Sequence, residues 1–208
     1  MRTPFFEGQQ PMAITVFDRN SRPDPCTLSL LAWLPTGSFP HLIAKEFWPL
    51  LSDTDLMRIA VLLALKSHEE GGCPIGAVVM ENSSRRIVGK GHNTLVQENH
   101  PYNHGETSAM RDAGSIDYSA TTIFTTLTPC KVCATLMVER GVSRVVIGNS
   151  PDPDNNEDFL RANGVDVVRL DDPMGIELYA RYRAAKPDQD LVDWRGVAAL
   201  RRKSGLES

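Results

Sequence analysis

Cysteine is scarce in this sequence, and its few cysteines do not form the pattern of a disulfide framework. The 208 residues contain four, and only two of them, Cys130 and Cys133, lie in a paired motif. The other two are Cys26 and Cys73. Small secreted proteins that are stapled by disulfides carry a denser and more regular set, because they fold in oxidising compartments. We therefore expect a reducing environment and a cytoplasmic protein.

An excess of positive charge is also lacking. Lys and Arg total 22 against 26 Asp and Glu, which gives a formal net charge of −4. Domains that bind the phosphate backbone of nucleic acids usually carry a basic stripe. Here the only basic cluster is residues 201–203, a pattern typical of a solvated tail. A nucleic-acid partner is therefore not expected.

Long apolar runs are absent as well. None approaches the about 20 residues of a transmembrane helix, and the first residues lack an apolar core followed by a small-residue cleavage site. We expect neither a membrane segment nor a signal peptide. The apolar content of 41% and the charged content of 23% are typical of a globular domain with a substantial core.

Residues 1–51 differ from the rest of the chain in composition. Proline recurs there at Pro4, Pro11, Pro23, Pro25, Pro35, Pro40 and Pro49. The segment also contains too many aromatic and apolar residues for a simple solvated tail. We expect a partly ordered N-terminal arm over residues 1–51 without a catalytic role, and a functional domain over residues 52–208.

The domain from Ser52 onwards alternates between helical spacing and short apolar strands. Helices are predicted from Ser52 to about residue 70, and over 104–113, 131–140, 157–162 and 173–185. Strands are predicted over 74–80, 87–92, 121–127, 144–148 and 165–170, and several are near-continuously apolar. This alternation predicts an α/β domain in three layers, with helices on both faces of a central five-stranded sheet.

Two short motifs carry the chemistry, His-Gly-Glu at 104–106 and Pro-Cys-Lys-Val-Cys at 129–133. One imidazole, of His104, and two thiolates, of Cys130 and Cys133, make three ligands, the number that a catalytic zinc ion has when its fourth position is open to water. The two cysteines share one face of a helix because they are three residues apart. A helix N-terminus also favours the thiolate over the thiol. The sequence therefore predicts a Zn²⁺ site.

Each motif alone is ambiguous, since a Cys-x-x-Cys pair also occurs in redox sites and in structural zinc ribbons. The joint pattern, His-x-Glu followed by Pro-Cys-x-x-Cys, is the signature of zinc deaminases. Glu106 lies in the first turn of the predicted helix that begins at His104, so its carboxylate can point at the water on the metal. We predict Glu106 as the catalytic acid and base.

From about Asp53 to Trp194 the sequence resembles the cytidine and deoxycytidylate deaminase superfamily, most of all the cytosine deaminases of the fungal type and their bacterial relatives. The resemblance is carried by residues 73–78, 91–93, 104–106, 125–133, 144–148 and 164–172. Gly105 belongs to it, because tRNA adenosine deaminases of the superfamily usually have Ala there. The resemblance implies a mixed five-stranded sheet, a zinc-dependent hydrolase acting on the C–N bonds of cyclic amidines, and a homodimer.

The resemblance also implies the substrate contacts. The amide of Asn93 and the backbone N–H of Gly105 would hydrogen-bond to the substrate ring. The carbonyl of Thr128 would meet the leaving amine. An acidic residue near the C-terminus would contact the amino group of the substrate, and Asp193 is the best positional match, with Asp190 as a competing match.

The expected pocket lid differs from that of the fungal enzymes, which close the pocket with a Phe after the fourth strand and a Trp near the C-terminus. Here residues 149–156 contain no aromatic residue, Trp194 lies only near the second position, and Tyr102 adds a ring before the first motif. We expect deamination of a small cytosine-like base. Three alternatives stay open: another free ring such as creatinine, guanine or a pterin, a base in tRNA or DNA, and a zinc-stabilised binding module without activity.

Overall fold

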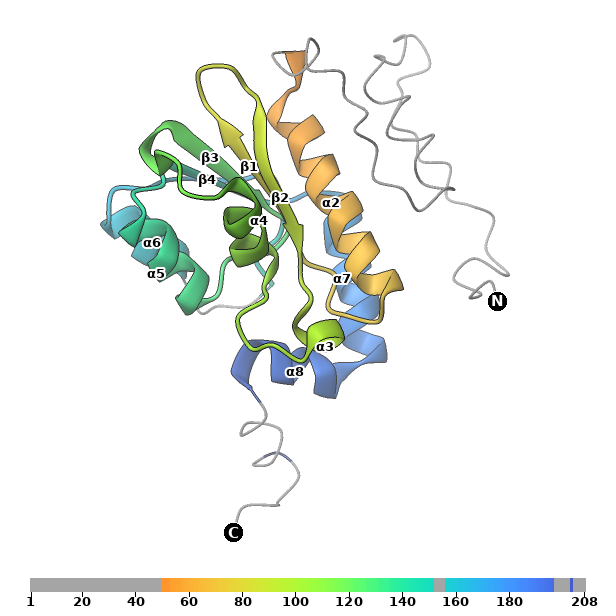
Figure 1. The fold of residues 1–208 in the computed structure, drawn as a ribbon. Coiled ribbons are helices and arrows are strands. Elements are labelled where there is room, and N and C mark those ends of the chain that lie inside the picture. Colours follow the sequence, from red (N-terminus) through yellow and green to blue (C-terminus); the bar gives the residue numbers. More distant parts are fainter. Residues whose placement is uncertain (1–49, 152–155, 197–202, 204–208) are drawn as a thin grey trace, which may run out of the picture. The chain divides into compact units, whose positions relative to one another are not determined.

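The computed structural model describes residues 50–151, 156–196 and 203, all within the compact unit that spans residues 43–208 (Figure 1). The arm expected over residues 1–51 therefore lies outside the described residues, apart from Leu50 and Leu51. Within the described residues, no helix combines the length and the apolar character needed to cross a lipid bilayer.

A mixed five-stranded sheet with the order β2-β1-β3-β4-β5 forms the centre of the domain. The strands are β1 (Gly76–Glu81), β2 (Ile87–His92), β3 (Thr121–Thr125), β4 (Arg144–Ile147) and β5 (Asp166–Arg169). β1 is antiparallel to β2 and β3, whereas β3, β4 and β5 run parallel. The α/β class and the mixed sheet predicted from the sequence are confirmed.

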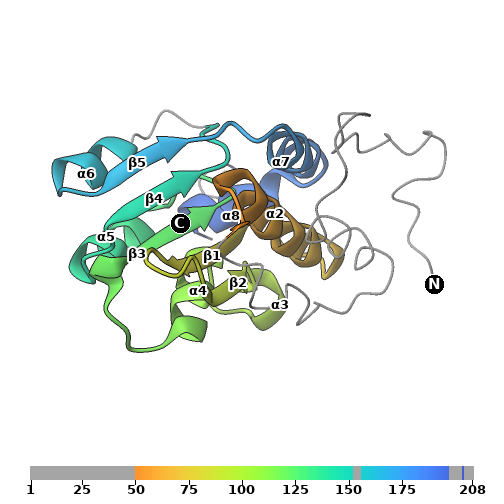
Figure 2. The same ribbon diagram turned by 90° about the horizontal axis from the view of Figure 1, so that it is seen from above.

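Helices cover both faces of this sheet (Figure 2). One face carries α4 (Gly105–Ala113), α5 (Lys131–Glu139) and α6 (Asn156–Ala162), and the other carries α2 (Asp53–Glu69) and α7 (Pro173–Ala185). Side chains from β1, β3 and β4 pack with those of α4, α5 and α6 in one buried cluster. Because both faces are covered, β1 is buried along nearly its whole length, as its apolar sequence predicted.

The local signals read from the sequence explain where the first helix begins and ends. The Ser52 hydroxyl accepts a hydrogen bond from the Asp55 backbone N–H at 3.2 Å, and the Ser52 backbone N–H donates to the Asp55 carboxylate at 2.8 Å. This reciprocal pair is a capping box. The helix ends before Gly71, whose φ of +96° favours glycine.

The structure also contains elements that sequence patterns did not predict. A four-residue helix, α3 (Leu95–Glu98), lies in the expected loop over 94–103, and a 3-10 turn, η2 (Tyr118–Ala120), precedes β3. The C-terminal segment after α7 forms α8 (Pro187–Arg195), with Pro187 at its first turn. This last helix matters most, because it brings Asp193 and Trp194 to the pocket described below.

Candidate active site

The candidate site lies at one end of the sheet, where two helices begin. His104 is the N-cap residue of α4, and Cys130 is the N-cap residue of α5, which follows the turn after β3. Neither side chain makes a capping hydrogen bond to its own helix. Both side chains therefore remain available to bind a ligand at the positive ends of the two helices.

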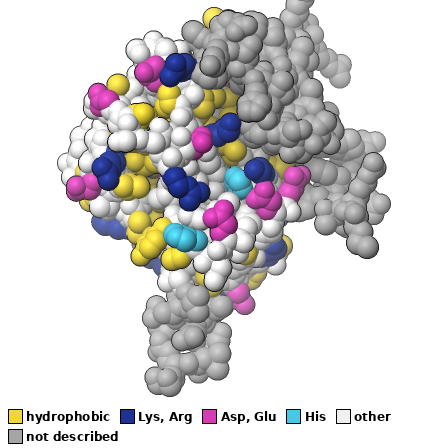
Figure 3. Space-filling view, in the orientation of Figure 1, with side chains coloured by type: hydrophobic (Ala, Val, Ile, Leu, Met, Phe, Trp, Pro, Cys, Tyr) yellow, Lys and Arg dark blue, Asp and Glu magenta, His cyan; other side chains and the backbone are white. Residues whose placement is uncertain are grey.

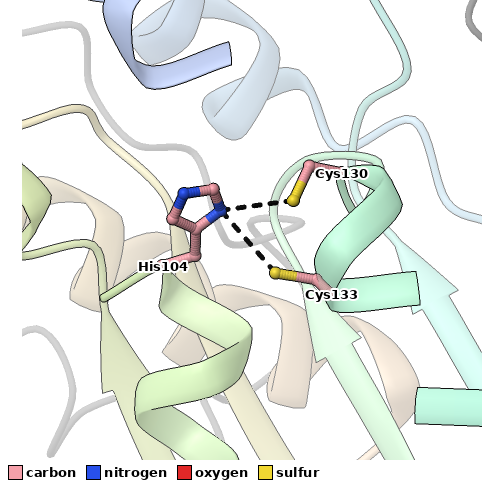
Figure 4. Close-up of side chains that lie close together, drawn as sticks. All are labelled: His104, Cys130 and Cys133. Atoms are coloured by element: carbon pink, nitrogen blue, oxygen red, sulfur yellow. Dashed lines mark hydrogen bonds between the residues drawn. The ribbon is translucent and has the colours of Figure 1, made fainter. Parts of the chain in front are cut away.

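The three predicted metal ligands lie together (Figure 4). The Nδ1 atom of His104 is 3.4 Å from the Cys130 sulfur and 3.6 Å from the Cys133 sulfur. A tetrahedral zinc ion with Zn–S bonds of about 2.3 Å and Zn–N bonds of about 2.0 Å separates such atoms by about 3.5 Å. The donor set therefore fits zinc, and no fourth side chain of the described residues joins the group.

The charges of this group also suit a metal. The pKa of Cys130 is lowered to about 4, first by the hydrogen bond from the Cys133 thiol and then by His104. The pKa of Cys133 is raised, because it donates that hydrogen bond and is buried. Burial lowers the pKa of His104, but the Cys130 thiolate outweighs this and raises it to about 9. A cation here would displace protons from His104 and Cys133, so binding is coupled to pH.

Glu106 lies beside the three ligands in the first turn of α4 and is only 3% exposed. Its Oε1 atom accepts a hydrogen bond from the Thr125 hydroxyl at 3.1 Å. Burial, and then the charge of Cys130, raise the pKa of Glu106 to about 6. A carboxyl group with such a pKa can both take up and release a proton near neutral pH.

A pocket opens at these residues, with an empty volume of about 230 Å³ including its mouth. It is lined by Ile75, His104, Glu106, Thr128, Cys130, Asp193 and Trp194. The structure therefore brings four sequence-predicted residues besides Glu106 to one cavity. Asn93 and Gly105 are not among the lining residues, although both lie directly beside them.

Asn93 lies behind the pocket wall and hydrogen-bonds to Asp193, which lines the pocket. It is fully buried, its Nδ2 donates to Asp193 Oδ1 at 2.8 Å, and its Oδ1 accepts from the Leu95 backbone N–H at 3.0 Å. Asp193 lines the pocket, and burial raises its pKa. Asp190, the competing match, instead accepts a hydrogen bond from the Tyr179 hydroxyl and is not a lining residue. The geometry thus separates the two aspartates that the sequence left open.

Comparison with known proteins agrees with this geometry. The family profile described as "Cytidine and deoxycytidylate deaminase zinc-binding region" matches residues 51–149. The cytosine deaminase of Candida albicans is 38% identical over 141 residues, which cover 66% of this chain and 91% of that protein. The chain belongs to the cytidine and deoxycytidylate deaminase family. It is a zinc-dependent hydrolase that acts on carbon–nitrogen bonds.

Other relatives of this deaminase act on different substrates. The tRNA-specific adenosine deaminase of Buchnera aphidicola (subsp. Schizaphis graminum) is 31% identical over 113 residues, which cover 52% of this chain and 74% of that protein. The solved guanine deaminase of Nitrosomonas europaea has a TM-score of 0.58 at 21% identity, over 71% of this chain and 94% of that one. The structural likeness confirms the fold, and the substrate follows from neither comparison.

Two residues of the deaminase pocket were not among the predicted site residues, Ile75 and Trp194. Ile75 gave no chemical signal in the sequence, because an apolar residue before a strand is ordinary. Trp194 was noted only as lying near an expected lid position. Tyr102, the other ring considered for the lid, is 62% exposed and is not a lining residue. Residues 152–155 of the expected lid loop lie outside the described residues.

Proposed function

We propose that this deaminase hydrolyses the exocyclic C–N bond of a small, cytosine-like heterocyclic base and releases ammonia. One observation carries the proposal: a buried Glu106 and two of the three zinc-type ligands, His104 and Cys130, face the same pocket. The 38% identical protein of Candida albicans is a cytosine deaminase, which supports a free single-ring base as the substrate.

His104, Cys130 and Cys133 are proposed to hold Zn²⁺. When bound, zinc lowers the pKa of a coordinated water from about 15.7 towards 7. Glu106 takes the proton of the attacking water and delivers it to the ring nitrogen. It then takes the second proton from the hydroxyl that the attack leaves on the ring carbon and gives it to the amine, so the product carries a carbonyl and ammonia departs. The hydrogen bond from Thr125 keeps the carboxylate oriented for both transfers.

Four residues are proposed to orient the base. Asp193 accepts a hydrogen bond from its amino group, and Asn93 fixes Asp193 through the 2.8 Å hydrogen bond. The Asn93 amide is proposed to hydrogen-bond to the ring carbonyl and the adjacent ring nitrogen, and the backbone N–H of Gly105 to add another donor. The carbonyl of Thr128, a residue that lines the pocket, is proposed to accept a hydrogen bond from the departing ammonia.

Other substrates are weighed against this proposal. Creatinine, guanine and pterins share the planar aminated ring, so the same residues suit them. Nucleic acid is disfavoured by the net charge of −4, and Figure 3 shows Lys and Arg interspersed with Asp and Glu on the visible face. The tRNA-specific relatives nevertheless keep RNA in the test. A binding module without activity would not require a buried Glu106 in its pocket.

Ammonia release tests the proposal. Zinc-loaded protein is offered cytosine, guanine, creatinine, a pterin, cytidine, adenosine and tRNA, and the kcat/KM values are compared. We expect about one zinc per chain by elemental analysis and the highest kcat/KM for a free base. Cys130→Ser should lose both metal and activity, whereas Cys26→Ala, at a cysteine outside both motifs, should keep both.

A failure on every compound, or turnover of tRNA alone, would overturn the proposed substrate class. Retention of zinc and activity by Cys130→Ser would overturn the ligand assignment. A cytoplasmic location and a homodimer remain predictions from the sequence.

A further inference from the structure

A chain of hydrogen bonds connects the pocket wall to the interior of the C-terminal helices. The indole Nε1 of Trp194 donates to the Tyr179 hydroxyl at 2.8 Å, and this hydroxyl donates to Asp190 Oδ1 at 2.6 Å. Trp194 lines the pocket, whereas Tyr179 lies behind it and is only 2% exposed. The chain therefore runs from the surface of the cavity into the core.

The chemistry of the three groups sets the direction of the chain. An indole N–H is a donor only and a carboxylate is an acceptor only, whereas a phenol can be both at once. Tyr179 uses its single proton towards Asp190 and a lone pair towards Trp194. Burial, and then the hydrogen bond to Asp190, raise the pKa of Tyr179 far above its usual value. The phenol therefore stays protonated near neutral pH.

These hydrogen bonds link Tyr179 on α7 to Asp190 and Trp194 on α8. Asp190 and Trp194 are four residues apart on α8 and so share one face. The Arg183 Nε atom, on α7, lies 3.4 Å from the second oxygen of Asp190. Asp193, which lines the pocket beside Glu106, directly precedes Trp194 on α8.

We propose that Tyr179 is a positioning residue that holds the indole of Trp194 as an aromatic wall of the pocket, and so sets the affinity for a planar substrate ring. The proposal rests on the proposed function. An aromatic wall binds a planar ring well only when its orientation is fixed, because the interaction depends on ring geometry. Asp190 fixes the hydroxyl of Tyr179, which gives this aspartate a role without substrate contact.

A packing role for the Tyr179 ring is the rival explanation, and the neighbouring Tyr182 separates the two. Tyr182 lies on the same helix, is fully buried, and stacks against Tyr179 with a centroid distance of 6.4 Å. Its hydroxyl interacts with the Cys73 thiol and, among the described residues, makes no hydrogen bond to Trp194 or Asp190. Tyr179→Phe and Tyr182→Phe therefore remove the same atom from the same cluster, and only the first removes the bond to Trp194.

NMR spectroscopy tests directly whether Tyr179 holds the indole of Trp194 in place. The indole N–H signals are recorded by two-dimensional NMR of the full-length, zinc-loaded protein, and Trp194→Phe identifies the signal of Trp194 among three tryptophans. We expect Tyr179→Phe to shift this signal and speed its exchange with solvent at least about tenfold, because the indole loses its acceptor. Tyr182→Phe should leave the signal in place. An unchanged Trp194 signal in Tyr179→Phe would overturn the proposal.

Steady-state kinetics with cytosine as the probe test the consequence for substrate affinity. Tyr179→Phe should raise KM about fivefold to tenfold with kcat changed by less than about twofold. Adding Trp194→Phe to Tyr179→Phe should cost no more than Trp194→Phe alone, because both act through one contact. Additive losses, or equal KM changes in Tyr179→Phe and Tyr182→Phe, would overturn it. If no compound of the panel is deaminated, the proposed function fails, while the spectroscopic test still decides the positioning.

Discussion

The two ends of the central sheet both carry charged side chains, but under opposite conditions. At the end where β3 leads into α5, Glu106 and Asp193 are 3% and 7% exposed, and burial raises the pKa of both. At the other end, Asp53 is about a quarter exposed and lies between two arginines. Despite partial burial, these arginines lower the pKa of Asp53.

The Asp53 end is an ion-pair network. The Asp53 carboxylate is 2.8 Å from Arg144 and 3.1 Å from Arg85, and Arg144 also contacts Asp166 at 3.2 Å. These contacts tie the start of α2 to the β1–β2 turn and to the starts of β4 and β5. Acidic groups that are paired and partly solvated stabilise a fold modestly, whereas buried groups with raised pKa values indicate a chemical role.

Glu106→Gln is the strongest test of this contrast. The amide keeps the size of the side chain and can still accept from Thr125, but it cannot carry the proton. We expect kcat to fall by about 10²–10⁴-fold, with zinc content and melting temperature nearly unchanged. Ammonia release, elemental analysis and calorimetry measure the three quantities. A Glu106→Gln enzyme with near-native turnover would end the assignment of Glu106 as the proton shuttle.

Local sequence was enough to predict which three candidate metal ligands lie together. The ligands and Glu106 lie within two short motifs, and each motif contains the N-cap residue of a helix, so spacing alone places the side chains. The same holds for the capping box of Ser52 and Asp55, which marks the start of α2. Sequence patterns that involve residues three or four positions apart can be recognised without knowledge of the tertiary structure.

The substrate wall could not be predicted in this way, because it depends on how distant helices dock. Asp190 and Asp193 are three residues apart on one helix, and only the packing of α8 against α7 directs one towards Tyr179 and the other towards the pocket. Ile75 reaches the pocket through its position before β1. The helix α3 escaped detection because it has four residues and no side-chain cap.

Gly105→Ala sharpens the contrast by changing the shape of the site rather than its charge. A Cβ atom at Gly105 would lie 3.2 Å from both the Cγ2 and the carbonyl oxygen of Ile75, so this wall residue must shift. The same carbonyl accepts from the Asn93 backbone N–H at 2.8 Å. We expect kcat/KM for cytosine to fall about tenfold, as overpacking of about 1–2 kcal/mol implies.

Gly175→Ala is the matched control for this change. Gly175 also lies in the first turn of a helix, but a Cβ atom there would approach Val61 only to 3.5 Å, an ordinary contact. Its kcat/KM should stay within about twofold of the native value. Equal values for the two alanine variants would show that Gly105 does not shape the pocket.

Asp53→Asn should have the smallest effect, and it should change stability rather than catalysis. At pH 7 we expect the free energy of unfolding to fall by about 1 kcal/mol, because the charge facing Arg85 and Arg144 is lost. Since the folded pKa of Asp53 is below 3.8, its contribution is complete above the unfolded pKa and disappears as the pH falls through the folded pKa. Denaturant melts at pH 7 and pH 3 measure the difference.

Asp158→Asn controls for the helix dipole in this last comparison. Asp158 also lies in the first turn of a helix, but its side chain is 70% exposed and its pair with Arg161 is at 3.4 Å. We expect a smaller loss of stability, because exposed pairs are screened by solvent. Both variants should keep the native kcat. If Asp53→Asn slowed deamination while leaving unfolding unchanged, the two ends of the sheet could not be separated into a stabilising end and a chemical end.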